Sequence, residues 1–99
     1  MLTTLTRDII SGLFAPELQE TVTVLLQAQC GNNLPLCGNW TPEQLERLQI
    51  AALKCSAGSL KKLQEAIRLA QQDWRDLLMM AGFGHDPEAH RHWLPETPR

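Results

Sequence analysis

The sequence predicts an all-α protein, a compact bundle of four or five short helices in a single domain over residues 1–99. Three observations predict this class. Apolar residues recur at spacings of three and four along most of the chain, which is the period of one helix face. No stretch combines strict apolar and polar alternation with β-branched or aromatic residues, as strands do. Glycine and proline divide the chain into segments of helical length.

The composition is that of an ordinary globular domain. Of the 99 residues, 43% are hydrophobic and 20% are charged, which suffices for one domain with a small core. The formal net charge of −2 disfavours general binding to nucleic acid, because that binding needs a surplus of lysine and arginine. No apolar run approaches the roughly 18 residues of a membrane span. Residues 1–7 lack the basic region and apolar block of a secretory signal, so a cytoplasmic protein is expected.

Two helices are expected in the first thirty residues. Apolar residues four apart predict a short amphipathic helix over residues 4–13. A second helix begins at Pro16, because proline suits the first helical position, and Gly31 is placed to end it. Residues 31–39 are rich in turn-forming types and are predicted to form a loop.

A helical hairpin over residues 41–56 and 59–72 is expected at the centre of the bundle. Thr41 and Gln44 have the T-x-x-Q spacing of a capping box. Ser59 is expected to cap the second helix, after a tight turn in which a glycine ends the first. In the first helix, four residues are expected to face the core, with Leu53 near the edge of this face: Leu45, Leu48, Ala52 and Cys55.

From residue 60 the apolar pattern is unusually regular. Seven residues at alternating spacings of three and four form one stripe: Leu60, Leu63, Ile67, Ala70, Trp74, Leu77 and Ala81. The region is either one helix over residues 59–82 or two helices separated at Asp73, and the usual length of about 12 residues favours the break. A last short turn is expected over residues 89–94, and residues 95–99 are expected to form a frayed tail.

Part of the chain resembles a group of small bacterial proteins of uncharacterised function. The similarity covers residues 48–63, 70–78 and 81–83, and its most distinctive piece is the segment 73–78 (DWRDLL). It implies a bacterial cytoplasmic protein and no particular activity. No functional residue is therefore carried over from it.

Three histidines near the C-terminus, His85, His90 and His92, are the candidates for a metal site, because imidazole is a good metal ligand. Their spacing is poor, since His90 and His92 lie two residues apart and would point about 200° apart on a helix. Histidines four apart and cysteine pairs separated by two residues, the spacings that converge on one ion, are absent. No metal and no cofactor is therefore expected.

The cysteines Cys30, Cys37 and Cys55 are odd in number, which is typical of reduced thiols in the cytoplasm. A bridge between Cys30 and Cys37 would close the predicted loop, and the sequence leaves this alternative open. Cys55 is expected to be buried as a small apolar residue.

No group of residues indicates catalysis. The serines lack the G-x-S-x-G context of an activated nucleophile. Asp73 and Asp76 are better explained by capping and by the positive end of a helix dipole than as an acid and a base. The sequence therefore predicts that the protein is not an enzyme.

The leading expectation is a small protein-interaction module, acting as a homodimer or as an acidic partner of another protein. The stripe over residues 60–81 supports it, because the stripe is long for one small core. Trp93 is the candidate interaction residue, since tryptophan is common among interface anchors. The alternative is a helix-turn-helix-like regulator linked to nucleic acid, because two helices flank the turn at 56–59 and the second carries basic residues. The charges disfavour it, since residues 59–82 carry four basic and three acidic residues and residues 1–58 carry three and five. A second alternative is metal binding through the C-terminal histidines.

Overall fold

The computed structural model describes residues 2–30, 41–84 and 89–92. The helices of this part of the chain are α1 (Thr4–Leu13), α2 (Pro16–Gln29), α3 (Pro42–Ser56), α4 (Leu60–Gln72), α5 (Trp74–Ala81) and the single turn α6 (Ala89–His92). The described residues form no strand, and the predicted all-α class is confirmed. The predicted loop at 31–39 and the tail at 95–99 lie outside the described ranges. None of the described helices is long and apolar enough to cross a bilayer.

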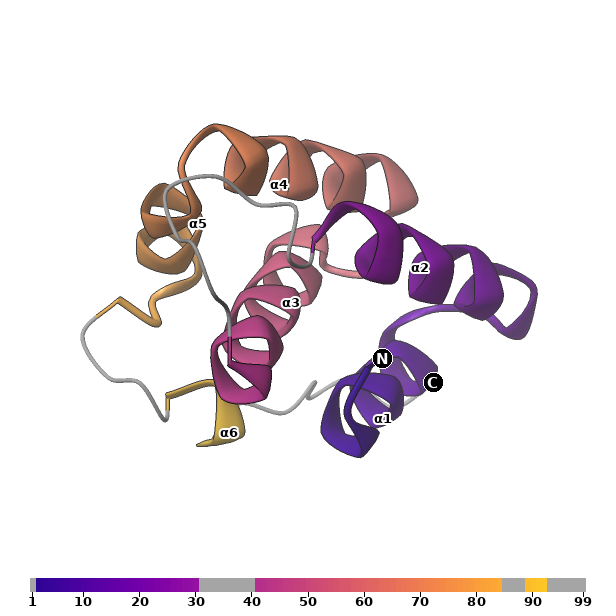
Figure 1. The fold of residues 1–99 in the computed structure, drawn as a ribbon. Coiled ribbons are helices and arrows are strands. Elements are labelled where there is room, and N and C mark those ends of the chain that lie inside the picture. The colour runs from indigo at the N-terminus through magenta and orange to yellow at the C-terminus, as the bar shows by residue number, and fades with distance from the viewer. Residues whose placement is uncertain (1, 31–40, 85–88, 93–99) are drawn as a thin grey trace.

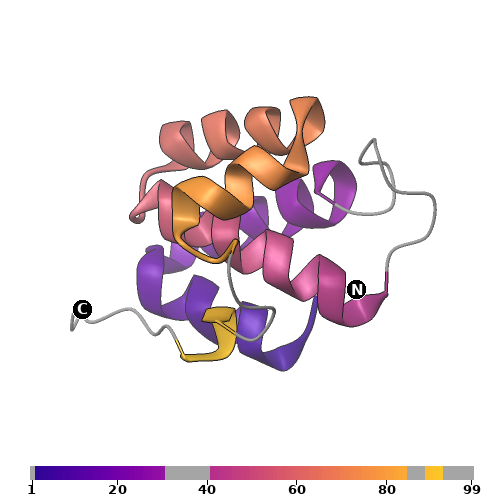
Figure 2. The same cartoon turned by 90° about the vertical axis from the view of Figure 1, so that its left-hand side faces the viewer.

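Helix α3 is the centre of the molecule. Figures 1 and 2 show α4 and α5 on one side of it and α1 and α6 on the other. Ile50, Ala51 and Leu53 are fully buried, although they point in different directions from the helix axis. Leu45 and Cys55, two of the four residues expected at the core, are only half-buried. The expectation of a single inner face on α3 is therefore wrong in detail, because helices pack around α3 from several directions.

The ends of α3 and α4 follow the sequence signals. The backbone N–H of Gln44 donates to Thr41 Oγ1 at 3.1 Å, and the backbone N–H of Thr41 donates to Gln44 Oε1 at 2.9 Å, so the predicted capping box is confirmed. Ser59 caps α4, as predicted. The turn between the two helices is left-handed at Ala57 (φ 51°) and at Gly58 (φ 84°), so α3 ends at a C-cap on Ala57, one residue earlier than expected.

The regular stripe is divided at Asp73, which confirms the expected break. Asp73 has an extended backbone (φ −160°, ψ 105°), and its Oδ1 accepts a hydrogen bond from the backbone N–H of Arg75 at 3.0 Å, which starts α5. Five residues of the stripe are buried: Leu63, Ile67, Ala70, Leu77 and Ala81. Leu60 and Trp74 are half-buried against the same core. The chain's own helices therefore cover the stripe, and the stripe does not remain free for a partner.

Two cations on α3 hold the C-terminal end of α5. Lys54 Nζ donates to the carbonyl oxygen of Ala81 at 2.8 Å and lies 4.9 Å from the centroid of the Phe83 ring. Arg47 donates to the carbonyl oxygen of Phe83. The Ala81 carbonyl lies at the end of α5, where unpaired backbone oxygens and the helix dipole favour a cation, and Phe83 follows two residues later. These contacts hold the end of α5 on α3.

Candidate functional site

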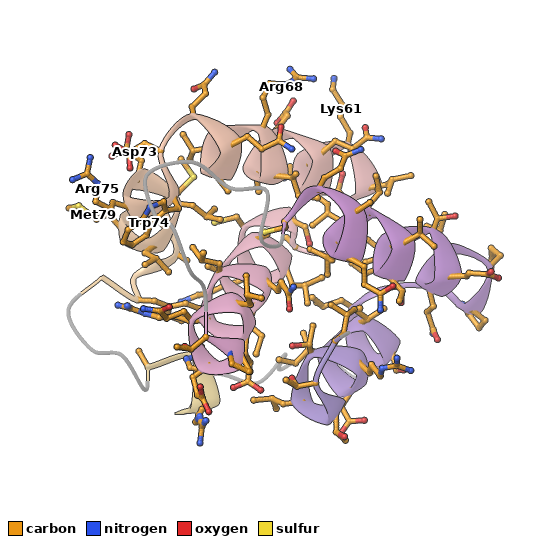
Figure 3. All side chains as sticks on the ribbon, viewed as in Figure 1. Lys61, Arg68, Asp73, Trp74, Arg75 and Met79 are labelled. Carbon is orange, nitrogen blue, oxygen red and sulfur yellow. The ribbon has the colours of Figure 1, made fainter. Side chains whose placement is uncertain are left out.

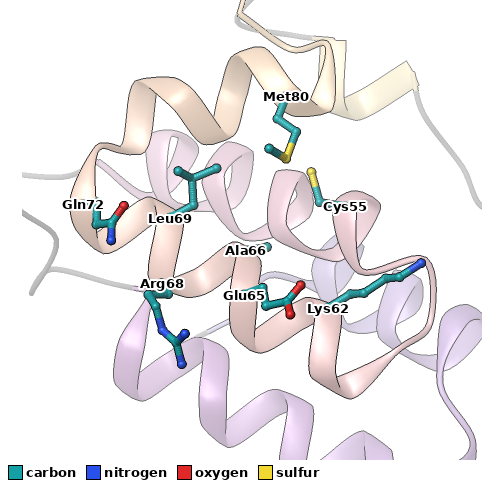
Figure 4. Close-up of a pocket in the computed structure, with 8 residues that line it drawn as sticks. All are labelled: Cys55, Lys62, Glu65, Ala66, Arg68, Leu69, Gln72 and Met80. Carbon is teal, nitrogen blue, oxygen red and sulfur yellow. The ribbon is translucent and has the colours of Figure 1, made fainter.

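A groove of about 540 Å³ lies between α4 and α5, and the last turn of α3 contributes to it (Figure 4). We call it the α4–α5 groove. Its lining residues are Cys55, Lys62, Glu65, Ala66, Arg68, Leu69, Gln72 and Met80. The groove therefore combines an apolar surface with two basic residues and one acidic residue.

On its α4 side, the groove is lined by a row of residues that lies next to the core-facing residues Leu63, Ile67 and Ala70 of the same helix. Lys62, Ala66 and Leu69 recur at spacings of four and three, so their side chains share one face. Ala66 contributes only a methyl group, which leaves space between α4 and the Met80 side chain. The position of α5, set by the break after α4, places Met80 opposite this row.

The methionines of α5 are unusually exposed for large apolar residues. Met79 is 73% exposed and Met80 is 67% exposed. A single exposed apolar residue such as Met79 is ordinary, but an exposed methionine that lines a groove, as Met80 does, is typical of surfaces that bind other proteins, because the methionine side chain is flexible and polarisable. Figure 3 shows Met79 on the outer side of α5 near Arg75, and Figure 4 shows Met80 over the groove.

The thiol in the groove is not activated. Figure 4 shows the sulfur of Cys55 facing the side chain of Met80. Burial raises the pKa of the Cys55 thiol, and the nearby charge of Lys54 offsets this only in part. Burial also raises the pKa of Cys30 to about 12. Both thiols are therefore protonated at neutral pH, the state in which a cysteine is a poor nucleophile. Cys37 lies outside the described residues.

A second polar cluster lies beneath α6, around the carboxylate of Glu46 on α3. His90 Nε2 lies 2.9 Å from Glu46 Oε1, and Arg91 Nε lies 3.6 Å from the same oxygen. The side chain of Glu46 is 9% exposed and that of His90 is 2% exposed. Because a carboxylate only accepts hydrogen bonds, His90 Nε2 carries the hydrogen and donates it. The pair fixes α6 on α3.

Glu46 is an anion at neutral pH. Burial raises the pKa of Glu46, but the hydrogen bonds from Thr3 and His90 and the positive charges of His90 and Arg91 lower it more, so the pKa lies below its usual value. Thr3 is also the N-cap of α1, where its Oγ1 accepts from the backbone N–H of Thr6. The carboxylate therefore joins α1, α3 and α6. A general acid would need a raised pKa, so this cluster is suited to holding the fold rather than to proton transfer.

The structure describes one of the three histidines proposed as metal ligands. His90 uses Nε2 for Glu46, and its buried Nδ1 has no hydrogen-bond partner among the described residues. His85 and the side chain of His92 lie outside what the structure describes, as does Trp93, the candidate interaction residue. Within the described ranges, no three histidine, cysteine, aspartate or glutamate residues are grouped so as to hold a metal ion.

Sequence reasoning missed both the α4–α5 groove and the Glu46 cluster. A signal for the groove was present, because the row through Ala66 has helical spacing and two methionines follow each other on α5. No sequence signal links Glu46 to His90, which are 44 residues apart. In comparisons with known proteins, no family model, no curated protein and no solved structure matches this chain.

Proposed function

We propose that the protein is a protein-interaction module that receives an amphipathic helix in the α4–α5 groove. The observation that supports this most directly is the 67% exposure of Met80 beside the apolar surface of Ala66 and Leu69. A groove between two helices is a common receptor for a third helix, whose apolar residues at spacings of three and four insert into it.

The charges of the groove favour an acidic helix. Lys62 and Arg68 outnumber Glu65 among the lining residues, although the whole chain has a net charge of −2. A helix that carries Asp or Glu beside its apolar face would therefore complement the groove in charge as well as in hydrophobicity. The protonated Cys55 thiol supplies no reactive group, so the groove is better suited to binding than to chemistry.

Selection of helical peptides from a phage-displayed library against the intact protein tests this function. The selected peptides are expected to have apolar residues three and four apart, flanked by Asp or Glu. Met80→Lys is expected to weaken their binding at least tenfold, about 1.4 kcal/mol, because it places a charge in the apolar contact. Binding is measured by fluorescence polarisation.

Met79→Lys is the matched control. Met79 is as exposed as Met80 and adjoins it, but it does not line the groove. Its replacement is expected to change peptide affinity by no more than about twofold, since an isolated surface substitution has little effect. Equal losses in the two variants, or a selection that yields no helical binder, would contradict the proposed function.

A second candidate function is supported by the outer face of α4. Three residues separate α3 from α4, as in helix-turn-helix proteins. The exposed surface of α4 carries Lys61, Lys62 and Arg68 against Glu65, and Figure 3 shows Lys61 and Arg68 on its outer side. A DNA-binding role predicts retention on heparin at about 50 mM salt and elution as salt rises, because binding releases counterions. Lys61→Glu is then expected to lower the salt concentration of elution. If the protein does not bind heparin at low salt, a DNA-binding function is contradicted.

A further inference from the structure

We infer that the helix received by the α4–α5 groove is α2 of a second copy of this chain, so that the protein self-associates. The inference rests on the proposed function, because it names the occupant of the same groove. It does not depend on the stripe over residues 60–81, which is buried within one chain.

The outer face of α2 has the chemistry that the groove requires. Glu17, Glu20 and Val24 are all exposed and recur at spacings of three and four, so they form one row along the helix. Val24 is 56% exposed. A shallow hollow of about 380 Å³ lies along this row and is lined in part by the half-buried Leu25. We call this surface the α2 row. It presents an apolar side chain beside two carboxylates.

The charges of the two helices are opposite. Helix α2 carries two acidic residues and no basic residue, a net charge of −2. Helix α4 carries three basic residues and one acidic residue, a net charge of +2. Opposite charges on two surfaces favour their encounter and disfavour the pairing of like surfaces. Helices α2 and α4 also adjoin within one chain, where Arg68 lies beside Leu25 and Gln29. Glu17, Glu20 and Lys62 are nevertheless exposed, so a second copy can neutralise them.

The two surfaces also match in length. The α2 row from Glu17 to Val24 extends about 10 Å along its helix, and the distance from Lys62 to Arg68 along α4 is about 9 Å. In the inferred dimer Val24 packs against Met80. The carboxylates of Glu17 and Glu20, on the same face of α2 as Val24, pair with Lys62 and Arg68. Because the row and the groove have similar lengths, both kinds of contact belong to one interface.

Each copy presents both surfaces on neighbouring helices. Helix α2 lies beside α4 in the same chain, where Gln71 Nε2 donates to the carbonyl oxygen of Gln29 at 3.1 Å. In two copies related by a two-fold axis, the α2 row of each copy can therefore bind in the α4–α5 groove of the other. Both rows and both grooves are then occupied, so the assembly closes as a dimer. The surfaces are small, so the dimer is expected to dissociate at about 10 to 100 μM, as weak interfaces do.

Sedimentation equilibrium of the full chain between about 10 μM and 1 mM tests the inference. The average mass is expected to rise from that of one chain toward twice that value. Two charge-reversed variants are expected to remain monomeric over this range, because each sets like charges against each other: Glu17→Lys with Glu20→Lys, and Lys62→Glu with Arg68→Glu.

An equal mixture of the two variants is expected to restore association. In the mixed dimer, a lysine-bearing α2 row meets a glutamate-bearing groove, and the unchanged row of one copy meets the unchanged groove of the other. Both contacts are then complementary. All four substituted residues are exposed, so the variants are expected to stay folded, with only a small fall in melting temperature where Glu17→Lys removes the acidic residue from the first turn of α2. Circular dichroism measures this.

Lys61→Glu is the matched control, since Lys61 lies on α4 but does not line the groove. It is expected to change the dissociation constant by no more than about threefold, through general charge effects alone. A chain that stays monomeric at about 1 mM would overturn the inference. So would association that survives both reversals, because the copies would then meet elsewhere. If peptides selected against the groove still depend on Met80, the proposed function stands without self-association.

Discussion

Glu46→Ala is expected to lower the free energy of unfolding by about 3 kcal/mol, because it leaves buried hydrogen-bond donors without the carboxylate that they share. His90 Nε2 would lose the acceptor that lies 2.9 Å away, and its side chain is only 2% exposed, so folding would no longer repay the hydrogen bond that water makes to it in the unfolded chain. Thr3 and Arg91 would lose the same partner. Urea unfolding at pH 7, followed by circular dichroism, measures the change.

Glu43→Ala is the control for this substitution. Glu43 lies on the same helix, one turn before Glu46, but it is exposed. Its replacement is expected to cost no more than about 0.5 kcal/mol. If Glu46→Ala cost no more than the control, the carboxylate would not be what holds α6 on α3.

The same carboxylate makes the stability depend on pH. The pKa of Glu46 is lower in the folded chain than its ordinary value of 4.5, so the unfolded chain takes up the proton first as the pH falls. The stabilisation is therefore fully present above about pH 4.5, and it is lost as the pH falls through the lower folded pKa. Glu46→Gln is expected to remove this part of the acid dependence in urea unfolding measured from pH 7 downward. An unchanged acid dependence would contradict it.

Gly58→Ala is expected to lower the free energy of unfolding by about 2 kcal/mol, through two additive causes. Gly58 has φ of 84°, a conformation that residues with a Cβ rarely adopt. A Cβ at this position would also lie 2.9 Å from the carbonyl oxygen of Leu13, at the end of α1. Either the turn or α1 must therefore shift. Thermal unfolding measured by circular dichroism gives the size of the effect.

Gly82→Ala separates the two causes. Gly82 has a similar φ of 79°, but a Cβ there would meet only Lys54 Nζ, at 3.8 Å, which is an ordinary contact. Only the conformational cost remains, and the expected loss is about 1 kcal/mol. The difference between the two variants measures how closely the α3–α4 turn packs on α1. Equal losses would show that α1 moves aside without cost.

Local sequence signals predicted the helix ends well. The capping box at Thr41 and the break at Asp73 each depend on hydrogen bonds between residues two or three positions apart. Such bonds form in the same way whatever surrounds the helix. The bounds of α1, the start of α2 and the separation of α4 from α5 could therefore be predicted without knowledge of the fold.

The role of α3 could not be predicted in the same way. Its apolar residues were expected to form one face, yet Leu48 and Ile50 are both buried, although residues two apart point about 160° away from each other around the helix axis. A run of six residues with only one polar side chain, 48–53, is compatible with several directions of packing. The helices that surround α3 decide which of these directions are buried, and their positions depend on contacts between distant parts of the chain.

The groove and the Glu46 cluster likewise combine features that the sequence shows with features that only the packing of the helices decides. The charges of α2 and α4 and the methionines of α5 can be read directly from the residues, but the groove exists only because α5 packs beside α4 above the end of α3. Likewise, Glu46 and His90 are separately ordinary residues, and only the placement of α6 on α3 brings them to 2.9 Å. Helix formation depends on neighbours within about four positions. Burial, and the pairing of residues far apart in the chain, depend on how completed helices cross, which no local pattern encodes.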